Sequence, residues 1–302
     1  MLNIYEQVDA NKRKSWLIMV LFVFFITAMV YLFAKALDFG AGWIGMALIF
    51  SGLASLGSFY YGDKVILGLS GARPADKKKN FMFFTVCENL CLVAQLPMPK
   101  LYVIDDSAPN AFATGRDPEH AVVCATTGLL SKLTRTELEG VIGHELSHVR
   151  NYDTRLMAIV AILIGIVALL SDWFMRSLWW GNRDEREDRS GLQGIVFIVA
   201  ILAALFSPII GQLIQLAISR RREFLADSGS VMLTRQPSGL INALKKIASD
   251  EEPLEAANKA TAHLYFCNPF KDKGHEFVGW FSHLFDTHPP ISDRIKALEQ
   301  TA

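Results

Sequence analysis

Two histidines and a glutamate stand close together near the middle of the chain, in the segment His144-Glu145-Leu146-Ser147-His148. Positions i and i+4 share one face of a helix, so both imidazoles can reach one metal ion. Glu145 then lies beside the open position of the metal without being a ligand. Two nitrogen ligands and a general base are what a zinc peptidase needs. The alternative is an ordinary amphipathic helix, since chance produces this pattern in about one per cent of chains this long.

A catalytic zinc ion takes three protein ligands and keeps one position open, so a third ligand is needed. The best candidate is Glu223, because the predicted topology returns the chain at Arg220 to the membrane face on which the histidines lie. Asp227, one helical turn further on, could orient a ligand histidine. For both acids the alternative is a solvated, charged helix end, but the two histidines favour ligation at Glu223.

Four apolar segments, at residues 16–34, 42–61, 156–170 and 192–217, predict membrane helices. The first is uncharged and long enough to cross a bilayer. For the second pair, a buried hairpin within the catalytic domain is the alternative. The content of 51% hydrophobic residues and the mean hydropathy of +0.27 agree with an integral membrane protein.

Basic residues near the ends of these segments predict their orientation. Lys12, Arg13 and Lys14 precede the first segment, and arginines follow the fourth, whereas the link between the first two contains only Lys35. The positive-inside rule therefore places both termini and the histidine motif in the cytoplasm. The formal net charge is zero, so there is no global electrostatic argument for binding nucleic acid.

A small sheet is predicted before the motif helix. Its three strands are expected at residues 101–104, 110–115 and 121–125. A helix is expected at 74–96, and a short one at 292–300 ends the chain. The segment from Thr134 to Glu137 is a capping box, which marks the beginning of the motif helix.

The predicted fold is mainly α, with about four transmembrane helices and a zincin-like α+β catalytic domain that contains the small β-sheet. The expected parts are an N-terminal transmembrane hairpin, a first catalytic part, a second transmembrane pair and a second catalytic part. Their boundaries are 1–63, 64–155, 156–219 and 220–302.

The chain resembles the HtpX-like membrane zinc metalloproteases, a gluzincin family related to the CAAX prenyl proteases. The resemblance covers nearly the whole chain, and the matching pieces occur in the order of the family. These pieces are Asn110 to Gly115, His144 to His148 followed by Asp153, Arg222 to Asp227, and Thr287-His288-Pro289-Pro290 with Arg294.

The resemblance implies that His144, His148 and Glu223 bind one zinc ion per chain and that Glu145 is the catalytic base. Zinc is the expected metal, while cobalt or manganese remains an alternative.

The resemblance also implies roles around the substrate. His288 and Arg294 are expected to contact the substrate or the developing oxyanion, and Asn110 is expected on a substrate-binding edge strand. From the sequence alone, His288 could equally be a loop histidine that bonds its own backbone.

The expected protein is therefore a multi-pass zinc endopeptidase of the bacterial inner membrane, with its active site facing the cytoplasm. Its partners are the lipid bilayer and unfolded or misfolded membrane proteins, whose cytoplasmic segments it cuts in quality control. The alternatives are a CAAX-type processing protease, a zinc-binding or transport protein without hydrolysis, and a membrane scaffold. Transport needs polar ligands near the bilayer midplane, which the apolar segments hardly offer. An intact Glu145 argues against the scaffold.

Overall fold

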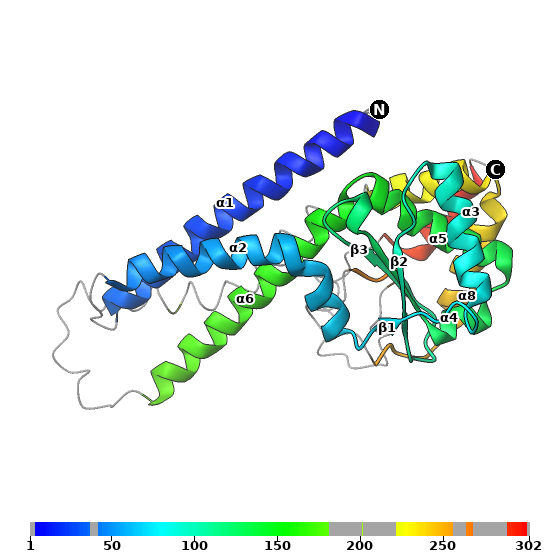
Figure 1. Ribbon diagram of the computed structural model, residues 1–302. Coiled ribbons are helices and arrows are strands. Elements are labelled where there is room, and N and C mark those ends of the chain that lie inside the picture. Colours follow the sequence, from blue (N-terminus) through cyan, green and yellow to red (C-terminus); the bar gives the residue numbers. More distant parts are fainter. Residues whose placement is uncertain are drawn as a thin grey trace.

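The computed structural model describes residues 4–36, 42–180, 201, 222–255, 264–267 and 289–300. Within these ranges the chain is mainly helical and contains one small sheet. Figure 1 shows three long helices that extend away from a rounded part built around the sheet. We call the three helices the helical arm and the rounded part the lobe. The arm consists of α1 (Ile4–Ala36), α2 (Gly42–Leu69) and α6 (Asp153–Trp180).

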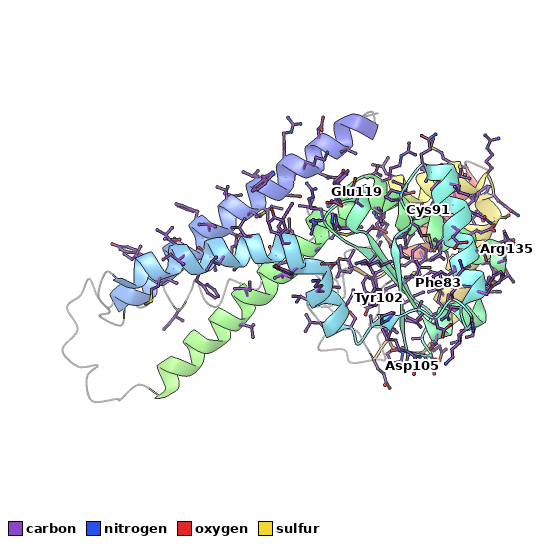
Figure 2. The ribbon with its side chains drawn as sticks, in the orientation of Figure 1. Phe83, Cys91, Tyr102, Asp105, Glu119 and Arg135 are labelled. Carbon is purple, nitrogen blue, oxygen red and sulfur yellow. The ribbon has the colours of Figure 1, made fainter. Side chains whose placement is uncertain are left out.

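The helices of the arm hold one another through apolar side chains. Met19 and Ile26 of α1 form a buried cluster with Ile159 and Leu163 of α6. Figure 2 shows other side chains of α1 and α2 projecting outward, away from the arm. Many of these are large, apolar and exposed, including Leu17, Val20, Phe24, Ile49 and Leu53. Such a continuous apolar surface is unfavourable in water and marks a site of contact with a membrane or a partner.

One helix in the described part of the chain, Ile44–Leu69 within α2, is long and apolar enough to cross a membrane. The predicted segment 156–170 lies inside α6. The predicted segment 192–217 lies outside the described residues, apart from residue 201. The number of membrane helices and the four domain boundaries therefore stay predictions.

The sheet of the lobe has four strands in the order β1-β2-β4-β3. β2 pairs with β4 in parallel, and β3 pairs with β4 antiparallel, which leaves β3 at one edge. The strands are β1 (Arg73–Pro74), β2 (Lys100–Ile104), β3 (Ala111–Thr114) and β4 (Val122–Thr126). The three strands predicted from the sequence are confirmed.

The helix predicted over 74–96 is wrong in its first turns, because α3 spans only Phe81–Ala94. The preceding residues are drawn away from helical geometry in two ways. Pro74 belongs to β1, which pairs with β2. The carboxylate of Asp76 then accepts the backbone N–H of Lys78 at 2.8 Å and forms a local turn.

The remaining helices of the lobe follow the sheet in the sequence. They are η1 (Pro118–His120), α4 (Thr127–Lys132), α5 (Arg135–Arg150), the helical residues 222–234, α8 (Pro237–Ser249) and α10 (Ile291–Glu299). α5 is the motif helix. At its beginning the backbone N–H of Thr134 donates to the carboxylate of Glu137 at 2.8 Å, within the predicted capping box.

The main core of the lobe lies between the sheet and the helices α3, α5 and α8. It includes Phe83 of α3, Val123 of β4, Ile142 of α5 and Leu244 of α8, each at most 1% exposed. Burying such a side chain contributes about 1.5–3 kcal/mol. Gly140 permits the close packing of α8, since a Cβ there would lie 2.7 Å from the backbone nitrogen of Leu240. The motif helix is therefore fixed by packing along its whole length.

Candidate metal centre

The two motif histidines lie one turn apart on α5 and point to the same place. His144 is 1% exposed and His148 is 4% exposed. Their Nε2 atoms are 3.1 Å apart. As expected for positions i and i+4 of a helix, both imidazoles are directed to one point.

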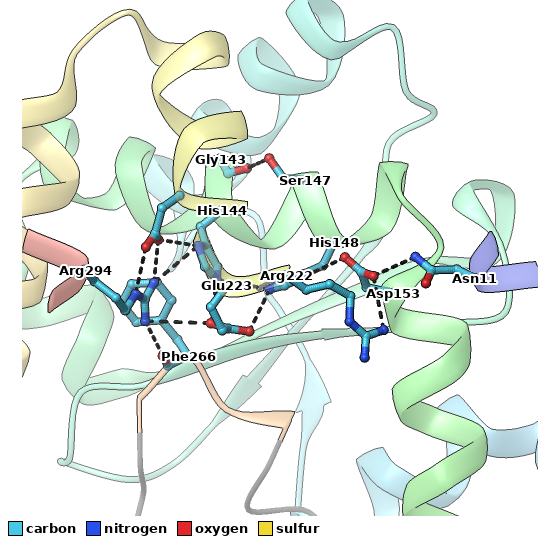
Figure 3. Close-up of polar contacts among 11 residues, drawn as sticks. Asn11, Gly143, His144, Ser147, His148, Asp153, Arg222, Glu223, Phe266 and Arg294 are labelled. Carbon is cyan, nitrogen blue, oxygen red and sulfur yellow. Dashed lines mark hydrogen bonds and ion pairs between the residues drawn. The ribbon is translucent and has the colours of Figure 1, made fainter. Parts of the chain in front are cut away.

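Glu223 reaches the same point from the helical residues 222–234. Its Oε2 lies 3.5 Å from His144 Nε2, and its Oε1 lies 3.5 Å from His148 Nε2. One ligand atom from each of the three residues lies within 4.8 Å of the other two. The structure thus brings together the three predicted ligands from segments far apart in the sequence (Figure 3).

The ring of His144 is held from behind by Asp227. His144 Nδ1 lies 2.9 Å from Asp227 Oδ1, so the carboxylate can accept the ring N–H. Burial raises the pKa of Asp227, but Arg294 and His144 outweigh it and lower that pKa to about 2. A carboxylate in this position fixes the tautomer and the orientation of a ligand histidine. Asp227 therefore lies beside a predicted ligand histidine, as its predicted orienting role requires.

Arg294 is the partner of Asp227. Its guanidinium donates to both carboxylate oxygens, from Nε to Oδ2 at 2.9 Å and from Nη2 to Oδ1 at 2.6 Å. Its Nη1 donates to the carbonyl of Phe266 at 3.0 Å. The side chain is 0% exposed with Phe266 packed on its guanidinium, and its Nη1 lies 3.8 Å from Glu223 Oε2. In this arrangement Arg294 orients Asp227 behind His144, and its expected contact with the substrate or the oxyanion stays a prediction.

The ring of His148 is held in the same way by Asp153, the first residue of α6. His148 Nδ1 lies 3.1 Å from Asp153 Oδ2. The other carboxylate oxygen accepts from Asn11 at 2.8 Å and from Arg222 at 3.3 Å. The sequence showed Asp153 within a matching segment but gave it no role. Its distance of five residues from His148 was the one available signal, while nothing in the sequence pointed to Asn11.

The donor set fits a cation such as zinc. Both Nδ1 atoms face carboxylates that can accept their ring protons, so each Nε2 is turned toward the point shared with Glu223. The two Nε2 atoms, 3.1 Å apart beside a carboxylate, favour a positive charge between them, which a metal ion or a ring proton can supply. Burial lowers the pKa of His148, yet its hydrogen bonds with Asp153 and Glu223 raise it to about 10. The environment therefore stabilises a positive charge at this point.

Glu145 is the next residue on α5 and is 2% exposed. Burial raises its pKa above the ordinary value, although the neighbouring histidines and a hydrogen bond with the backbone of Ala113 lower it. A raised pKa makes the carboxylate a better proton acceptor near neutral pH than an exposed glutamate. The position and the basicity of Glu145 suit a general base.

Asn110 directly precedes the edge strand β3 and binds another part of the chain. Its Nδ2 donates to the carbonyl of Cys267 at 2.9 Å, and its Oδ1 accepts from the N–H of Cys267 at 3.2 Å. The N–H of Phe266 donates to the carbonyl of Ala111 at 2.8 Å. The edge strand therefore hydrogen-bonds a further backbone segment, here the chain's own residues 266 and 267.

Two further predicted features can be placed only in part. His288 lies outside the described residues, so its expected contact with the substrate stays a prediction. The aromatic ring of Phe266, which the sequence did not single out, covers His144 with 4.9 Å between ring centroids. The geometry is that of a buried metal-binding site next to a strand edge.

Comparison with known proteins supports the same chemistry. The family model described as peptidase family M48 matches residues 82–302. A protease HtpX homolog from Caldanaerobacter subterraneus is 42% identical over 98% of this chain and 97% of its own length. Homologs with the same description from Ligilactobacillus salivarius and Lactobacillus helveticus are 41% and 43% identical, each over 98% of this chain and 99% of their own.

The fold is similar to that of a solved membrane protease. The crystal structure of Ste24p from S. mikatae aligns with a TM-score of 0.50 and 20% identity. The alignment covers 90% of this chain and 62% of Ste24p. The helical arm and the lobe are therefore similar in architecture to a larger solved protein.

Proposed function

We propose that this chain, which belongs to peptidase family M48 and is a metalloprotease, is a zinc endopeptidase of the cytoplasmic membrane. Its proposed substrates are cytoplasmic segments of misfolded or damaged membrane proteins. The observation that carries the proposal is the convergence of His144, His148 and Glu223 beside Glu145.

The proposed chemistry is hydrolysis of a peptide bond. His144, His148 and Glu223 would hold the zinc ion, which when bound polarises water and the scissile carbonyl as a Lewis acid. Glu145 takes a proton from the attacking water and delivers it to the leaving nitrogen. Asp227 and Asp153 keep the two imidazoles turned toward the metal throughout.

The proposed membrane placement rests on the arm and on the charge pattern. We propose four membrane helices, formed by α1, α2, α6 and a segment at 192–217. The exposed apolar side chains of α1 and α2 support contact with lipid. Lysines and arginines near the ends of the apolar segments favour a cytoplasmic site. An active site close to the membrane surface would reach membrane proteins more readily than soluble ones.

The proposed preference for extended substrates rests on the edge strand β3. Residues 266 and 267 pair there through backbone groups and the amide of Asn110. A substrate strand would use the same groups after displacing this segment. Backbone pairing reads little of the side-chain sequence, so it selects unfolded segments rather than one motif.

The test uses purified full-length protein in lipid vesicles with one membrane substrate in a folded and a destabilised form. Both forms carry the same cytoplasmic segment. We expect faster cleavage of the destabilised form, and loss of cleavage in Glu145→Gln. Glu139→Gln is the matched control, since it makes the same chemical change on the same helix, where Glu139 contacts Arg135.

Equal cleavage of the two forms would contradict the quality-control proposal, and full activity of Glu145→Gln would contradict the mechanism. A prenylated peptide in the same assay tests the alternative of a CAAX-type processing protease. Cleavage of this peptide alone would favour that alternative.

A further inference from the structure

The hydrogen bonds behind His148 lead to a residue of the helical arm. Asn11, on α1, is 5% exposed. Its side-chain nitrogen donates to Asp153 Oδ1 at 2.8 Å and to the carbonyl of Asn151 at 2.8 Å. An amide group has two such hydrogens, so these contacts use both. Figure 3 shows Asn11 meeting the carboxylate that holds His148.

Both acceptors of Asn11 belong to the short joint between α5 and α6. Tyr152, between them, has a φ of 59°, in the left-handed region that non-glycine residues rarely adopt. Lys12 places its ammonium 4.4 Å from the centre of the Tyr152 ring, within range of a cation–π interaction. α1 therefore holds the joint through two consecutive residues. Lys12 contacts the strained Tyr152, and Asn11 contacts the residues before and after it.

We propose that Asn11 is a positioning residue for the metal site and acts through Asp153 and His148. Its hydrogen bond fixes the Asp153 carboxylate so that the other oxygen meets His148 Nδ1, which leaves Nε2 directed at Glu223. The family match begins at residue 82, so Asn11 belongs to a part of the chain outside the matched domain. The inference rests on the proposed zinc site, and Asn11 would increase the affinity of that site for zinc.

The expected effect is partial because Asp153 has a second partner. Arg222 Nη1 lies 3.3 Å from the same carboxylate oxygen and remains when Asn11 is replaced. Removing the partner of a metal ligand weakens binding by about 10–100-fold. Since Asn11 acts one contact further out, we expect an increase of about five- to tenfold in the zinc Kd.

The experiment measures the zinc Kd of full-length protein in detergent by competition with a chromophoric chelator. All proteins carry Glu145→Gln, which prevents hydrolysis during the titration. Asn11→Leu keeps a similar volume and removes both donors. Asn11→Ala is the second variant, because alanine favours the helix and keeps the test valid if the leucine variant does not fold. Ser15→Ala is the matched control, since Ser15 is equally buried one turn further along and bonds the carbonyl of Asn11.

We expect both Asn11 variants to raise the zinc Kd and to shift the absorption bands of the cobalt-loaded protein, while Ser15→Ala leaves both unchanged. In an Asp153→Ala background, Asn11→Leu should add no further loss, because residues that act through one another are not additive. Additive losses, or an unchanged Kd in both Asn11 variants, would overturn the inference. Absence of zinc binding by the parent protein would instead count against the proposed function.

Discussion

The two histidines on α5 are one turn apart, yet they are held from different parts of the molecule. His144 is held by Asp227, which is itself clamped through both carboxylate oxygens by a guanidinium within the lobe. His148 is held by Asp153, which begins a helix of the arm and is bonded from α1. One side of the site is thus built from the lobe, and the other depends on the arm.

The two sides of the site are expected to affect stability and metal binding differently. On the His144 side, a buried ion pair fixes one ligand rigidly, and breaking it affects the fold of the lobe. On the His148 side, a carboxylate is held by a neutral amide and by Arg222, whose side chain is 14% exposed. That side affects the metal more than the fold. The lobe therefore supplies all three predicted ligands, while the arm supplies the groups that orient His148.

The largest expected effect is that of Asp227→Ala. The substitution leaves the buried guanidinium of Arg294 without its carboxylate, and breaking a buried pair in this way costs about 3–5 kcal/mol. The zinc affinity should fall by about 10–100-fold as well. Denaturant unfolding and a zinc competition titration measure the two losses.

A double variant separates the two losses. With Arg294→Leu added to Asp227→Ala, the guanidinium that lost its carboxylate is also removed, so part of the lost stability should return. The zinc affinity should stay low because His144 still lacks its partner. Full recovery of the zinc affinity would show that Asp227 does not act on His144.

The second effect is that of Asp153→Ala. We expect a similar loss of zinc affinity, about 10–100-fold, but a smaller loss of stability, about 1–3 kcal/mol. The smaller cost follows because Arg222 is partly exposed and Asn11 is uncharged. Equal destabilisation by Asp153→Ala and Asp227→Ala in the same unfolding assay would remove the distinction between the two sides.

The third effect is that of Arg294→Lys. Lysine keeps the charge near Asp227 but cannot reproduce the two parallel hydrogen bonds and the bond to Phe266. We expect a loss of about 1–2 kcal/mol in the unfolding free energy, below that of Asp227→Ala. A lysine variant with wild-type stability would show that charge alone holds this side.

The smallest effect concerns protons on the His148 side. Without metal, His148 has a pKa of about 10, so near neutral pH a proton must leave before the ring binds zinc. The zinc affinity should therefore rise as the pH increases toward that value. In Asp153→Asn the pKa falls toward the ordinary 6.5, and the rise should end at a lower pH. Asp227→Asn is the control and should keep the wild-type slope, and equal slopes in all three proteins would contradict this assignment.

Local patterns predicted those parts of the site and fold that depend on neighbouring residues. The spacing of His144 and His148, the capping box at Thr134 and the three strands follow from helical and extended periodicity. Glu223 was found through the predicted topology rather than through its own surroundings. The expected contact of Arg294 with substrate came from the resemblance and stays a prediction, while the structure shows its ion pair with Asp227.

The parts that the sequence did not reveal depend on distant contacts. Asn11 is separated from Asp153 by 142 positions, and a single asparagine before an apolar segment carries no pattern. The orientation of Asp153 toward His148 depends on the left-handed turn at Tyr152, which is rare for tyrosine. The strand β1 contains two residues and a proline, which gives almost no periodic signal.

We propose that His144, His148 and Glu223 hold a metal ion beside the general base Glu145. The most direct measurement determines bound zinc and cleavage in the same preparations of wild type, Glu145→Gln and Glu223→Ala. We expect one zinc ion per chain in wild type and in Glu145→Gln, cleavage only in wild type, and reduced zinc in Glu223→Ala. Cleavage by Glu145→Gln at the wild-type rate, or a full zinc complement in Glu223→Ala, would contradict the account.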